Sequence, residues 1–164
     1  MTFTVDLTKY AKKTKSEIGT AKRAIVFQVF ANVIKMSPVD KGRFKGNWFI
    51  TEDNPATYSR LTTDTSAAGN LGPESEKELA LISEKFTIDI LTNNLAYAGV
   101  LEFGGYPDPV KNGTRINKSG TRKNPITPIY EKRSNRGYSR QAPFGMVRIT
   151  LRKFNRIAKK EGWS

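Results

Sequence analysis

The longest helical pattern of this 164-residue chain lies at its start, and it constrains the fold more than any other feature. Thr4 or Asp6 can cap a helix. The sequence "SPVD" ends that helix near Met36, because the residue before Pro38 is pushed out of the α region. Two rows of apolar residues follow nearly opposite sides of it. One row is Ile18, Ala21, Ile25, Val29, Val33 and Met36, and the other is Phe27, Phe30 and Ile34.

A helix that is apolar on two sides must be covered on two sides. A single small domain offers one sheet as the first cover. The second cover is either a neighbouring subunit or a second helix of the same chain, and the pattern alone leaves both open.

The next part of the chain predicts two paired strands. After a tight turn at residues 40–42, the pattern predicts a strand over 44–52, with Trp48 and Ile50 on one face. The stretch "KFTIDILTN" alternates Phe86, Ile88 and Ile90 with other positions and predicts the partner strand.

Loops and short helices connect and follow these strands. Residues 54–73 are rich in Thr, Ser, Ala, Gly and Pro and predict a mobile loop. Residues 74–83 predict a short helix with acidic residues in its first turn, where the helix dipole favours them. The sequence "LAYAGVLEFGG" predicts one or two helical turns closed by Gly104 and Gly105.

Residues 106–136 have the character of an insertion into this domain. The sequences "GGYPDP" and "RGYSRQAP" echo each other at its borders, and the segment holds 8 Lys/Arg and 2 Asp/Glu. Its middle could form a hairpin around residues 118–120. We expect it to project and to contact a partner or a central channel through its basic residues, which are Lys111, Arg115, Lys118, Arg122 and Lys123.

The end of the chain predicts a basic helix. Pro143 suits the first helical position. Four residues form its apolar stripe, Val147, Leu151, Phe154 and Ala158, while Arg148, Arg152, Arg156 and Lys160 recur at every fourth position. Like charges at that spacing repel. An acidic partner or phosphates could offset this repulsion, and a simple solvated basic face is the alternative.

Composition limits the chemistry that the chain can support. It has no cysteine and no histidine, so disulfides, thiolate metal sites and Ser–His or Cys–His nucleophile pairs are excluded. The start, "MTFTVDLTKYAKKTK", lacks the pattern of a signal peptide, and no stretch is apolar enough to span a membrane. We expect no enzyme activity, no cofactor and no membrane contact, in a protein made in the cytoplasm.

The net charge of +13 is unevenly distributed. Residues 1–50 carry 10 Lys/Arg and 3 Asp/Glu, residues 51–100 carry 3 and 8, and residues 101–164 carry 15 and 4. A chain with this charge distribution can bind nucleic acid or acidic proteins, including its own copies. A basic nucleic-acid-binding module is therefore an alternative function, although no helix-turn-helix, RRM or zinc-finger pattern is present.

Glu102 is the one carboxylate within the apolar run "AYAGVLEFGG". A carboxyl group in such surroundings could be a general acid, but it would need a second group, and Asp108 is the nearest acid. The structural hypothesis is that Glu102 accepts backbone N–H groups or an arginine. We expect it to fix the "EFGG" turn against the turn at 40–43 or against the start of the last helix near Arg148.

Three segments, in this order, resemble one known family. They are "SPVDKGRFKGNW", "TNNLAYAGVLEFG" and "GYSRQAPFGMVRIT". Together they are similar to the tail-completion, or head–tail joining (neck), family of tailed bacteriophages. The matching positions are Ser37, Pro38, Val39, Asp40, Gly42, Arg43, Trp48, Asn93, Asn94, Tyr97, Ala98, Leu101, Glu102, Phe103, Gly104, Gln141, Ala142, Pro143, Gly145, Met146, Val147 and Arg148.

The resemblance implies a single α+β domain over residues 1–164, in which a small antiparallel β-sheet is packed by a long N-terminal helix and a C-terminal helix. The long loops at 54–73 and 106–136 lie outside the resemblance, and the insertion at 106–136 is a departure from the compact members of the family. It implies a virion structural protein whose ring, commonly six-fold, completes the tail top at the neck. It brings no catalytic activity, cofactor or metal. The implied partners are further copies and tail-tube, tail-terminator or connector proteins, and any contact with DNA in the channel would be non-specific.

A ring joins two different faces of each subunit. For these faces we predict the residues Phe27, Phe30, Ile34, Asp40, Arg43, Tyr97, Glu102, Phe103, Arg140, Arg148 and Arg152. If Glu102 serves this joint, Glu102→Gln should impair assembly and leave the folding of the monomer nearly intact.

Overall fold

The computed structural model describes residues 3–105, 134–135, 138–139 and 141–162, and it describes their side chains except at residues 3–13 and 134–135. Its helices are α1 (Phe3–Lys35), a 3-10 turn η1 (Lys45–Asn47), α2 (Pro73–Ala80), α3 (Ala98–Phe103), α4 (Val147–Arg152) and α5 (Phe154–Lys160). Its strands are β1 (Phe49–Glu52), β2 (Asp89–Thr92), β3 (Ser134–Asn135) and β4 (Tyr138–Ser139). The fold is α+β, as the sequence predicts. The basic loop residues Lys111 to Lys123 and Arg140 lie outside the described residues.

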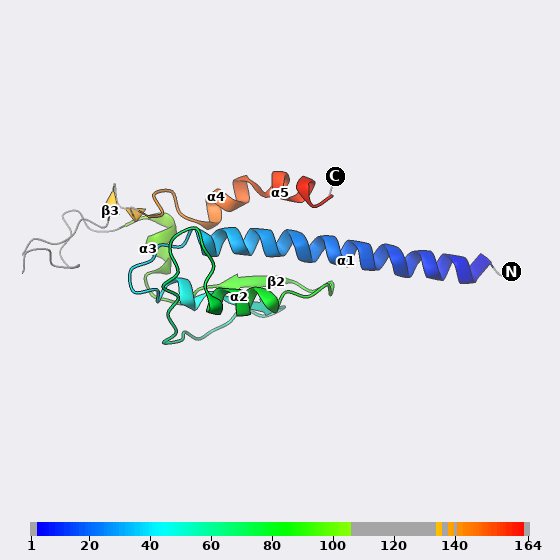
Figure 1. Ribbon diagram of the computed structural model, residues 1–164, viewed down its shortest axis with the longest axis horizontal. Coiled ribbons are helices and arrows are strands. Elements are labelled where there is room, and N and C mark those ends of the chain that lie inside the picture. Colours follow the sequence, from blue (N-terminus) through cyan, green and yellow to red (C-terminus); the bar gives the residue numbers. More distant parts are fainter. Residues whose placement is uncertain (1–2, 106–133, 136–137, 140, 163–164) are drawn as a thin grey trace, which may run out of the picture.

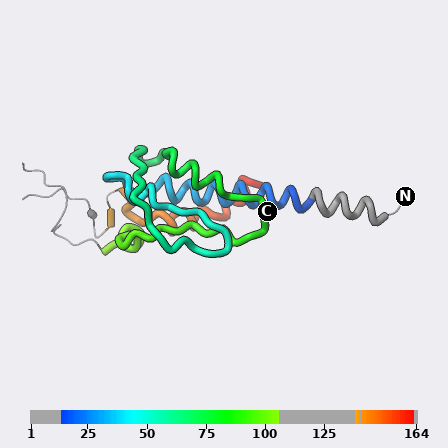
Figure 2. Tube along the Cα trace, turned by 90° about the horizontal axis from the view of Figure 1, so that it is seen from below, coloured from blue at the N-terminus to red at the C-terminus, as the bar shows by residue number. Residues whose placement is uncertain are grey.

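Helix α1 is the axis of the domain. Its 33 residues extend over roughly 50 Å at 1.5 Å per residue. Helices α4 and α5 lie along one side of it, and α2 with the β1–β2 sheet lies along the other (Figure 1). Toward its N-terminus α1 runs on beyond these layers, as the view turned by 90° also shows (Figure 2).

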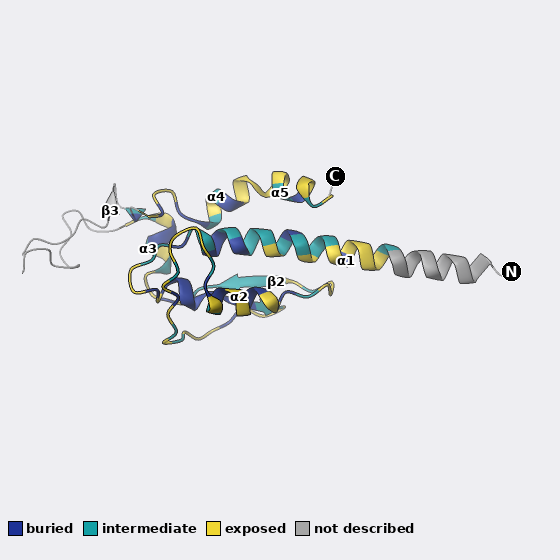
Figure 3. Cartoon of the chain, viewed as in Figure 1, coloured by how far each residue is buried: buried dark blue, intermediate teal, exposed yellow. Residues whose placement is uncertain are grey.

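The second apolar row of α1 is covered mainly by the same chain. Ile34 is fully buried and Val33 is 2% exposed, so the C-terminal half of the helix is enclosed between the two layers (Figure 3). Phe30 packs against the core from a partly buried position. Phe27 remains 38% exposed. Of the predicted interface residues on α1, Ile34 therefore belongs to the core of its own domain, and Phe27 alone keeps a substantial exposed surface.

The two predicted strands pair as expected, but they are shorter. β1 and β2 are antiparallel, with Phe49 opposite Thr92 and Glu52 opposite Asp89. Residues 44–47 do not extend the strand, because the chain turns there: Gly42 has a φ of 76° and Gly46 N–H bonds back to its carbonyl oxygen. At the outer edge of β1, the N–H of Ile50 donates to the buried carboxylate of Glu78 at 2.9 Å, which blocks further pairing there.

The connection from α2 to β2 is fastened onto α1. Gly19 lets it approach closely, since a Cβ at this position would lie 2.8 Å from the carbonyl oxygen of Glu84. Lys22 pairs with Asp89 at 2.5 Å, and Arg23 donates to the carbonyl of Ile82 at 2.9 Å. The predicted strand begins too early, because Phe86 and Ile88 precede β2, which starts at Asp89. Phe86 is 56% exposed and Ile88 is 68% exposed.

The loop predicted over 54–73 has no helix or strand before Pro73, but a buried polar network anchors it to η1. Lys45 is 1% exposed, and its ammonium donates to the Ser66 hydroxyl at 2.7 Å and to the carbonyls of Ser66, Ala67 and Asn70 at 3.2, 3.2 and 2.6 Å. Asp64 is 3% exposed and accepts from both the backbone and the hydroxyl of Ser66. The loop is therefore part of the packed domain rather than a free segment.

Asp64 is held as a carboxylate within this network. It also accepts from Gly72 N–H at 3.2 Å and from the Ser75 hydroxyl at 2.5 Å. Burial opposes its ionisation, but the hydrogen bonds from Ser66 and Ser75, with the nearby charge of Lys45, lower the pKa of the Asp64 carboxyl below its ordinary value. For Lys45, burial lowers the pKa of the ammonium and the charge of Asp64 raises it.

The C-terminal helix differs from the prediction in two respects. Pro143 does not open it. Gly145 has a φ of 78°, which no right-handed helix contains, so α4 begins only at Val147. The helix is also interrupted at Lys153, which separates α4 from α5. Of its predicted apolar stripe, Ala158 is buried, whereas Leu151 is 56% and Phe154 43% exposed.

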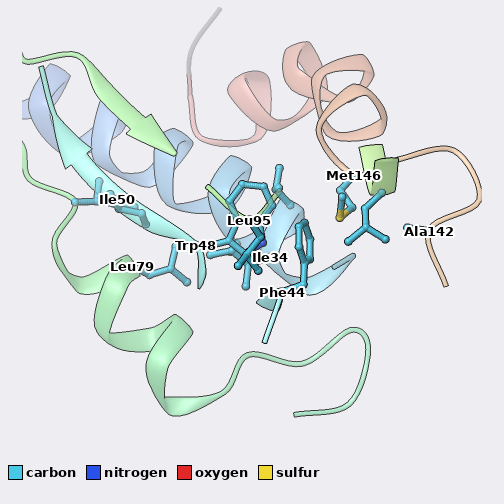
Figure 4. Packing of buried hydrophobic residues seen from close by; sticks show 12 residues of the cluster. Ile34, Phe44, Trp48, Ile50, Leu79, Leu95, Ala142 and Met146 are labelled. Atoms are coloured by element: carbon cyan, nitrogen blue, oxygen red, sulfur yellow. The ribbon is translucent and has the colours of Figure 1, made fainter. Parts of the chain in front are cut away.

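The core lies where the layers meet at the C-terminal half of α1. Ile34 contributes from α1, Phe44 and Trp48 from the turn before β1, Leu79 from α2, and Met146 from the start of α4 (Figure 4). The rings of Phe44 and Trp48 pack edge to face, with centroids 5.6 Å apart. The core thus joins every layer at one end of the domain.

Replacing Lys45 by methionine tests the buried network. Lys45→Met keeps the length of the side chain but leaves three carbonyl oxygens without their donor and Asp64 without its cation. We expect the free energy of unfolding to fall by about 2–4 kcal/mol. Denaturant titration followed by circular dichroism measures this loss. Lys77→Met is the control, because its exposed pair with Glu74 contributes a few tenths of a kcal/mol; equal losses in the two variants would contradict the account.

The lowered pKa of Asp64 predicts a dependence of stability on pH. A carboxyl group whose pKa is lower in the folded state stabilises the fold above its unfolded pKa, ordinarily 3.8. That contribution is lost as pH falls through the lower folded pKa. We expect wild type to lose more stability than Asp64→Asn on acidification from neutral pH to below 3.8. Parallel losses in denaturant titrations over this range would refute the role of Asp64.

Candidate functional site

Glu102 joins α3 to the start of α4. Its side chain is buried, with the residue 8% exposed. It accepts from the backbone N–H groups of Met146, Val147 and Arg148 at 2.7, 3.0 and 3.0 Å. One carboxylate therefore binds three consecutive N–H groups. We call this arrangement the Glu102 joint.

The physical basis of the joint is the unsatisfied N-terminus of α4. The first N–H groups of a helix have no partner within it, and a side-chain oxygen of the N-cap residue usually accepts one of them. The N-cap residue here is Met146, which has no acceptor suited to this task and makes no such bond. Glu102 supplies the acceptor from another helix, and its negative charge suits the positive end of the helix dipole.

Gly145 and Arg148 complete the joint. A Cβ on Gly145 would lie 2.5 Å from the carbonyl oxygen of Glu102 and 2.7 Å from its Oε1, so only glycine fits there. Arg148 donates through Nη2 to the Glu102 carbonyl at 2.7 Å, and its Nε lies 3.4 Å from the carboxylate. The helix start is therefore held by both the side chain and the backbone of Glu102.

The turn after α1 is bound to the same region. Val39 N–H donates to the side-chain oxygen of Gln141 at 2.6 Å, and the Gln141 amide returns a bond to the Val39 carbonyl at 2.8 Å. Trp48 Nε1 donates to the Ser37 hydroxyl at 2.8 Å. Asn93 donates to the carbonyl of Phe44 at 2.9 Å. The three segments that carry the family resemblance therefore meet at one end of the domain.

Exposed aromatic side chains stand on the segments that form the joint. Phe103 and Phe144 are 67% and 68% exposed, and Tyr97 is 40% exposed. The guanidinium of Arg148 lies 5.4 Å from the centre of the Phe103 ring and 5.9 Å from that of Tyr138. We call Tyr97, Phe103, Phe144 and Arg148 the aromatic rim. Tyrosine, phenylalanine and arginine are residue types that are enriched at protein interfaces.

Local charges modify two groups of the rim. Burial raises the pKa of the Tyr97 hydroxyl, while Arg43 lowers it and Asp40 raises it. The side chain of Tyr138 contributes most to a raised pKa of the Arg148 guanidinium, and Glu102 adds to it, against the opposing effect of desolvation. Tyr97 is therefore neutral and Arg148 charged at neutral pH.

The predicted interface residues divide into four groups. Around the joint lie Asp40, Arg43, Tyr97, Glu102, Phe103 and Arg148. Phe27, Phe30 and Ile34 lie along α1, and Arg152 is exposed on α4. Arg140 lies outside the described residues. The structure thus brings together about half of the predicted set.

Glu102 acts within its own chain. The contact with the start of α4 near Arg148 is confirmed. The expectation that Glu102→Gln leaves the monomer nearly unperturbed is not supported by these contacts, because the carboxylate satisfies three N–H groups inside the domain. Asp108, the acid considered as its catalytic partner, lies outside the described residues.

Some functional residues were missed from the sequence. Phe144 precedes Gly145, which has a positive φ, and a glycine turn at this point could have indicated that the Phe144 side chain is exposed. Lys45, Asp64 and Glu78 gave no signal, because charged residues in short segments are usually solvated. Glu78, which is 6% exposed, pairs with Arg60 in addition to its bond with β1.

The described residues hold no cluster of three acidic, cysteine or histidine side chains that could bind a metal ion. Over the same residues, no helix combines the length and the apolar character that crossing a bilayer requires.

Substituting Glu102 by glutamine tests the joint. The amide NH₂ of glutamine cannot accept a hydrogen bond, so at least one N–H of α4 loses its acceptor and the favourable charge is removed. We expect the free energy of unfolding to fall by about 1–3 kcal/mol. Thermal and denaturant unfolding measure it. Glu76→Gln, at an exposed position of α2, is the control and should change little; equal effects would show that the joint contributes nothing.

The chain was also compared with known proteins. No family model, no curated protein and no solved structure matches it. The function of the Glu102 joint and its rim is therefore inferred from their own contacts.

Proposed function

We propose that this protein is a structural component of a tailed bacteriophage particle. In this proposal its copies form a closed ring where the tail meets the head, with the six copies that the family resemblance implies. The ring completes the tail top and connects it to the neck, after synthesis in the host cytoplasm. The observation that supports this function is that the three segments of the family resemblance converge in one joint, where they hold each other by hydrogen bonds.

The joint has the properties that an assembly contact needs. It fixes the end of α3 and the start of α4, and with them the positions of Phe103 and Phe144. Aromatic side chains and arginine are the residues that contribute most to binding at protein interfaces. Because their backbone is held beforehand, little conformational entropy is lost when a partner binds. The aromatic rim is therefore the surface that we assign to a neighbouring ring or to the tail tube.

The chemistry of the described site favours contact over catalysis. The buried carboxylates Glu102, Asp64 and Glu78 each bind groups of the domain itself. Such groups fix backbone and loops, and each has its hydrogen-bonding capacity directed inward. The side chains that reach solvent at the joint include the aromatic rings, Arg43 and Arg148, together with Asp40 and Gln141.

Assembly and binding to tail tubes test this function together. The native mass of an 18.4 kDa chain is measured by sedimentation over a range of concentrations and at about 0.05 to 0.5 M salt. We expect a species near six times the chain mass, and co-sedimentation with purified tail tubes. Phe103→Ser with Phe144→Ser should weaken tail-tube binding at least about tenfold and leave folding intact, since both rings are exposed.

Leu61→Ser is the matched control for the rim, because Leu61 is 87% exposed and lies in the loop before α2. It should bind as wild type does. A chain that remains monomeric and binds neither tail tubes nor connectors would contradict the proposal.

A basic nucleic-acid-binding module is the second candidate, and one observation favours it. Arg152, Lys153, Arg156, Lys159 and Lys160 are all exposed on α4, on α5 and at the residue between them. Duplex DNA should then bind with an affinity that falls steeply as salt rises. Fluorescence anisotropy with labelled duplex at low and physiological salt measures this. Lack of binding at about 50 mM salt would remove this candidate.

A further inference from the structure

Strand β2 has one edge that no described residue pairs with. Along an antiparallel strand, residues alternately turn their backbone N–H and C=O groups toward the neighbouring strand and away from it. Ile50 lies opposite Leu91, and the N–H of Ile50 points away from β2, because it donates to Glu78. The backbone groups of Leu91 therefore point away from β1, and by the same alternation so do those of Asp89.

This edge is available for pairing within the described part of the chain. No described residue donates to or accepts from the outward backbone groups of Asp89 and Leu91. β1 is the one described strand that pairs with β2, and the residues of β2 are half-buried. A sheet of two strands is marginally stable by itself, and further strands stabilise it. We call the outward N–H and C=O groups of Asp89 and Leu91 the β2 edge.

β2 lacks the features that usually protect an edge strand. Such strands are kept from further pairing by a proline, by a bulge or by an inward-pointing charge. The register of β2 runs without a bulge, and none of its residues is a proline. Its one charged side chain, Asp89, is neutralised by Lys22 of its own chain at 2.5 Å. The outer edge of β1, in contrast, is closed by Glu78, so the sheet is open on the side of β2.

The backbone chemistry of the edge indicates its occupant. A row of free N–H and C=O groups accepts an extended backbone, which adds a strand to the sheet. Among the described strands, β1 cannot supply it, because Glu78 closes its outer edge, and β3 and β4 have two residues each. β2 is already extended and open along the same edge, so a second copy brings a partner strand that loses little entropy on pairing. We infer that the β2 edge binds the β2 edge of a second copy, antiparallel and about a two-fold axis.

One register satisfies every group of the β2 edge. Asp89 lies opposite Leu91 of the second copy, and Leu91 opposite Asp89, so that each N–H meets a C=O. The axis passes between the two copies of Ile90, which form the kind of pair whose side chains approach most closely. Ile88, which is 68% exposed, lies opposite Thr92 on the same face of the sheet. The pairing therefore covers an exposed apolar side chain and places no like charges opposite each other.

This contact goes beyond the proposed ring. Both copies use the same surface, so the contact is isologous and closes at a dimer, whereas a ring joins two different faces of each subunit. The dimer joins the two small sheets into one and removes an edge that could otherwise template aggregation. Because a head-to-tail ring does not contain such a contact between its neighbours, the dimer belongs to the free protein. The aromatic rim takes no part in it, since the residues of the rim lie next to α3 and α4.

Disulfide cross-linking tests the two-fold register directly. The chain has no cysteine, so an introduced thiol has only the same thiol of another copy as a protein partner. Ile90→Cys places these thiols opposite each other, where the Cα atoms of a non-hydrogen-bonded pair are about 4.5 Å apart and a disulfide can form. With copper phenanthroline as oxidant, we expect a covalent dimer of about twice 18.4 kDa on non-reducing gels.

Ile88→Cys is the matched control, because Ile88 is more exposed than Ile90 but lies opposite Thr92 rather than opposite itself. This variant should cross-link at least about tenfold more slowly than Ile90→Cys, since its thiols are out of disulfide reach. A mixture of Ile88→Cys with Thr92→Cys should cross-link rapidly again, as a dimer of two different chains.

Charge at the axis provides a test without cross-linking. Ile90→Lys places two ammonium groups opposite each other, so its dimer should bind at least about tenfold more weakly than that of wild type. Mixed with Ile90→Glu, it should pair again, because opposite charges then face each other. Sedimentation over a concentration series measures both effects, and circular dichroism with thermal unfolding verifies that the variants fold.

Failure of this inference differs from failure of the proposed function. The inference is overturned if wild type stays monomeric up to about 1 mM, or if Ile90→Cys and Ile88→Cys cross-link at equal rates. It is also overturned if the amides of the β2 edge gain protection from hydrogen exchange only when tail tubes are added, since a strand of another protein then occupies the edge. The proposed function depends instead on tail-tube binding through the rim. Phe103→Ser with Phe144→Ser should accordingly leave the cross-linking of Ile90→Cys unchanged.

Discussion

The acceptance of three backbone N–H groups by the Glu102 carboxylate is the interaction on which the rest of the structure depends. It fixes where α4 begins and thereby sets the layer that covers one side of α1. Gly145 must lack a side chain so that the carboxylate can approach, and Arg148 closes the contact from the far side. This carboxylate within an apolar run therefore serves as a structural cap.

A second polar network performs a similar task at the other layer. Lys45 and Asp64 hold the long loop before α2 against the turn that precedes β1. Both networks satisfy buried charges by several short hydrogen bonds, which is the condition under which such charges are tolerated in a core. The domain thus keeps its small sheet and its two layers fixed along one helix, and leaves aromatic and charged side chains free on its outer surfaces.

The sequence predicted those parts of the fold that depend on periodicity or on local turn chemistry. The long helix, the pairing of the two strands and the glycine end of α3 follow from such signals. The predicted start of the last helix at Pro143 was wrong. Gly145 has a positive φ, which interrupts a helix begun at Pro143, and nothing in the local sequence pattern indicates it. The prediction of a strand before Phe49 was also wrong, since the bond from Gly46 N–H to the carbonyl of Gly42 closes a turn there. Contacts between residues distant in sequence, such as that of Lys45 with Asn70, produce no periodic pattern from which they could be predicted.

The most direct test of the central claim is amide hydrogen exchange at Met146, Val147 and Arg148, followed by NMR. The account predicts that these three amides exchange slowly in wild type, although a helix of six residues leaves its first N–H groups without partners of its own. In Glu102→Gln their protection should fall selectively, while the amides of β1 keep theirs. Fast exchange of the three amides in wild type would contradict the claim that Glu102 caps this helix.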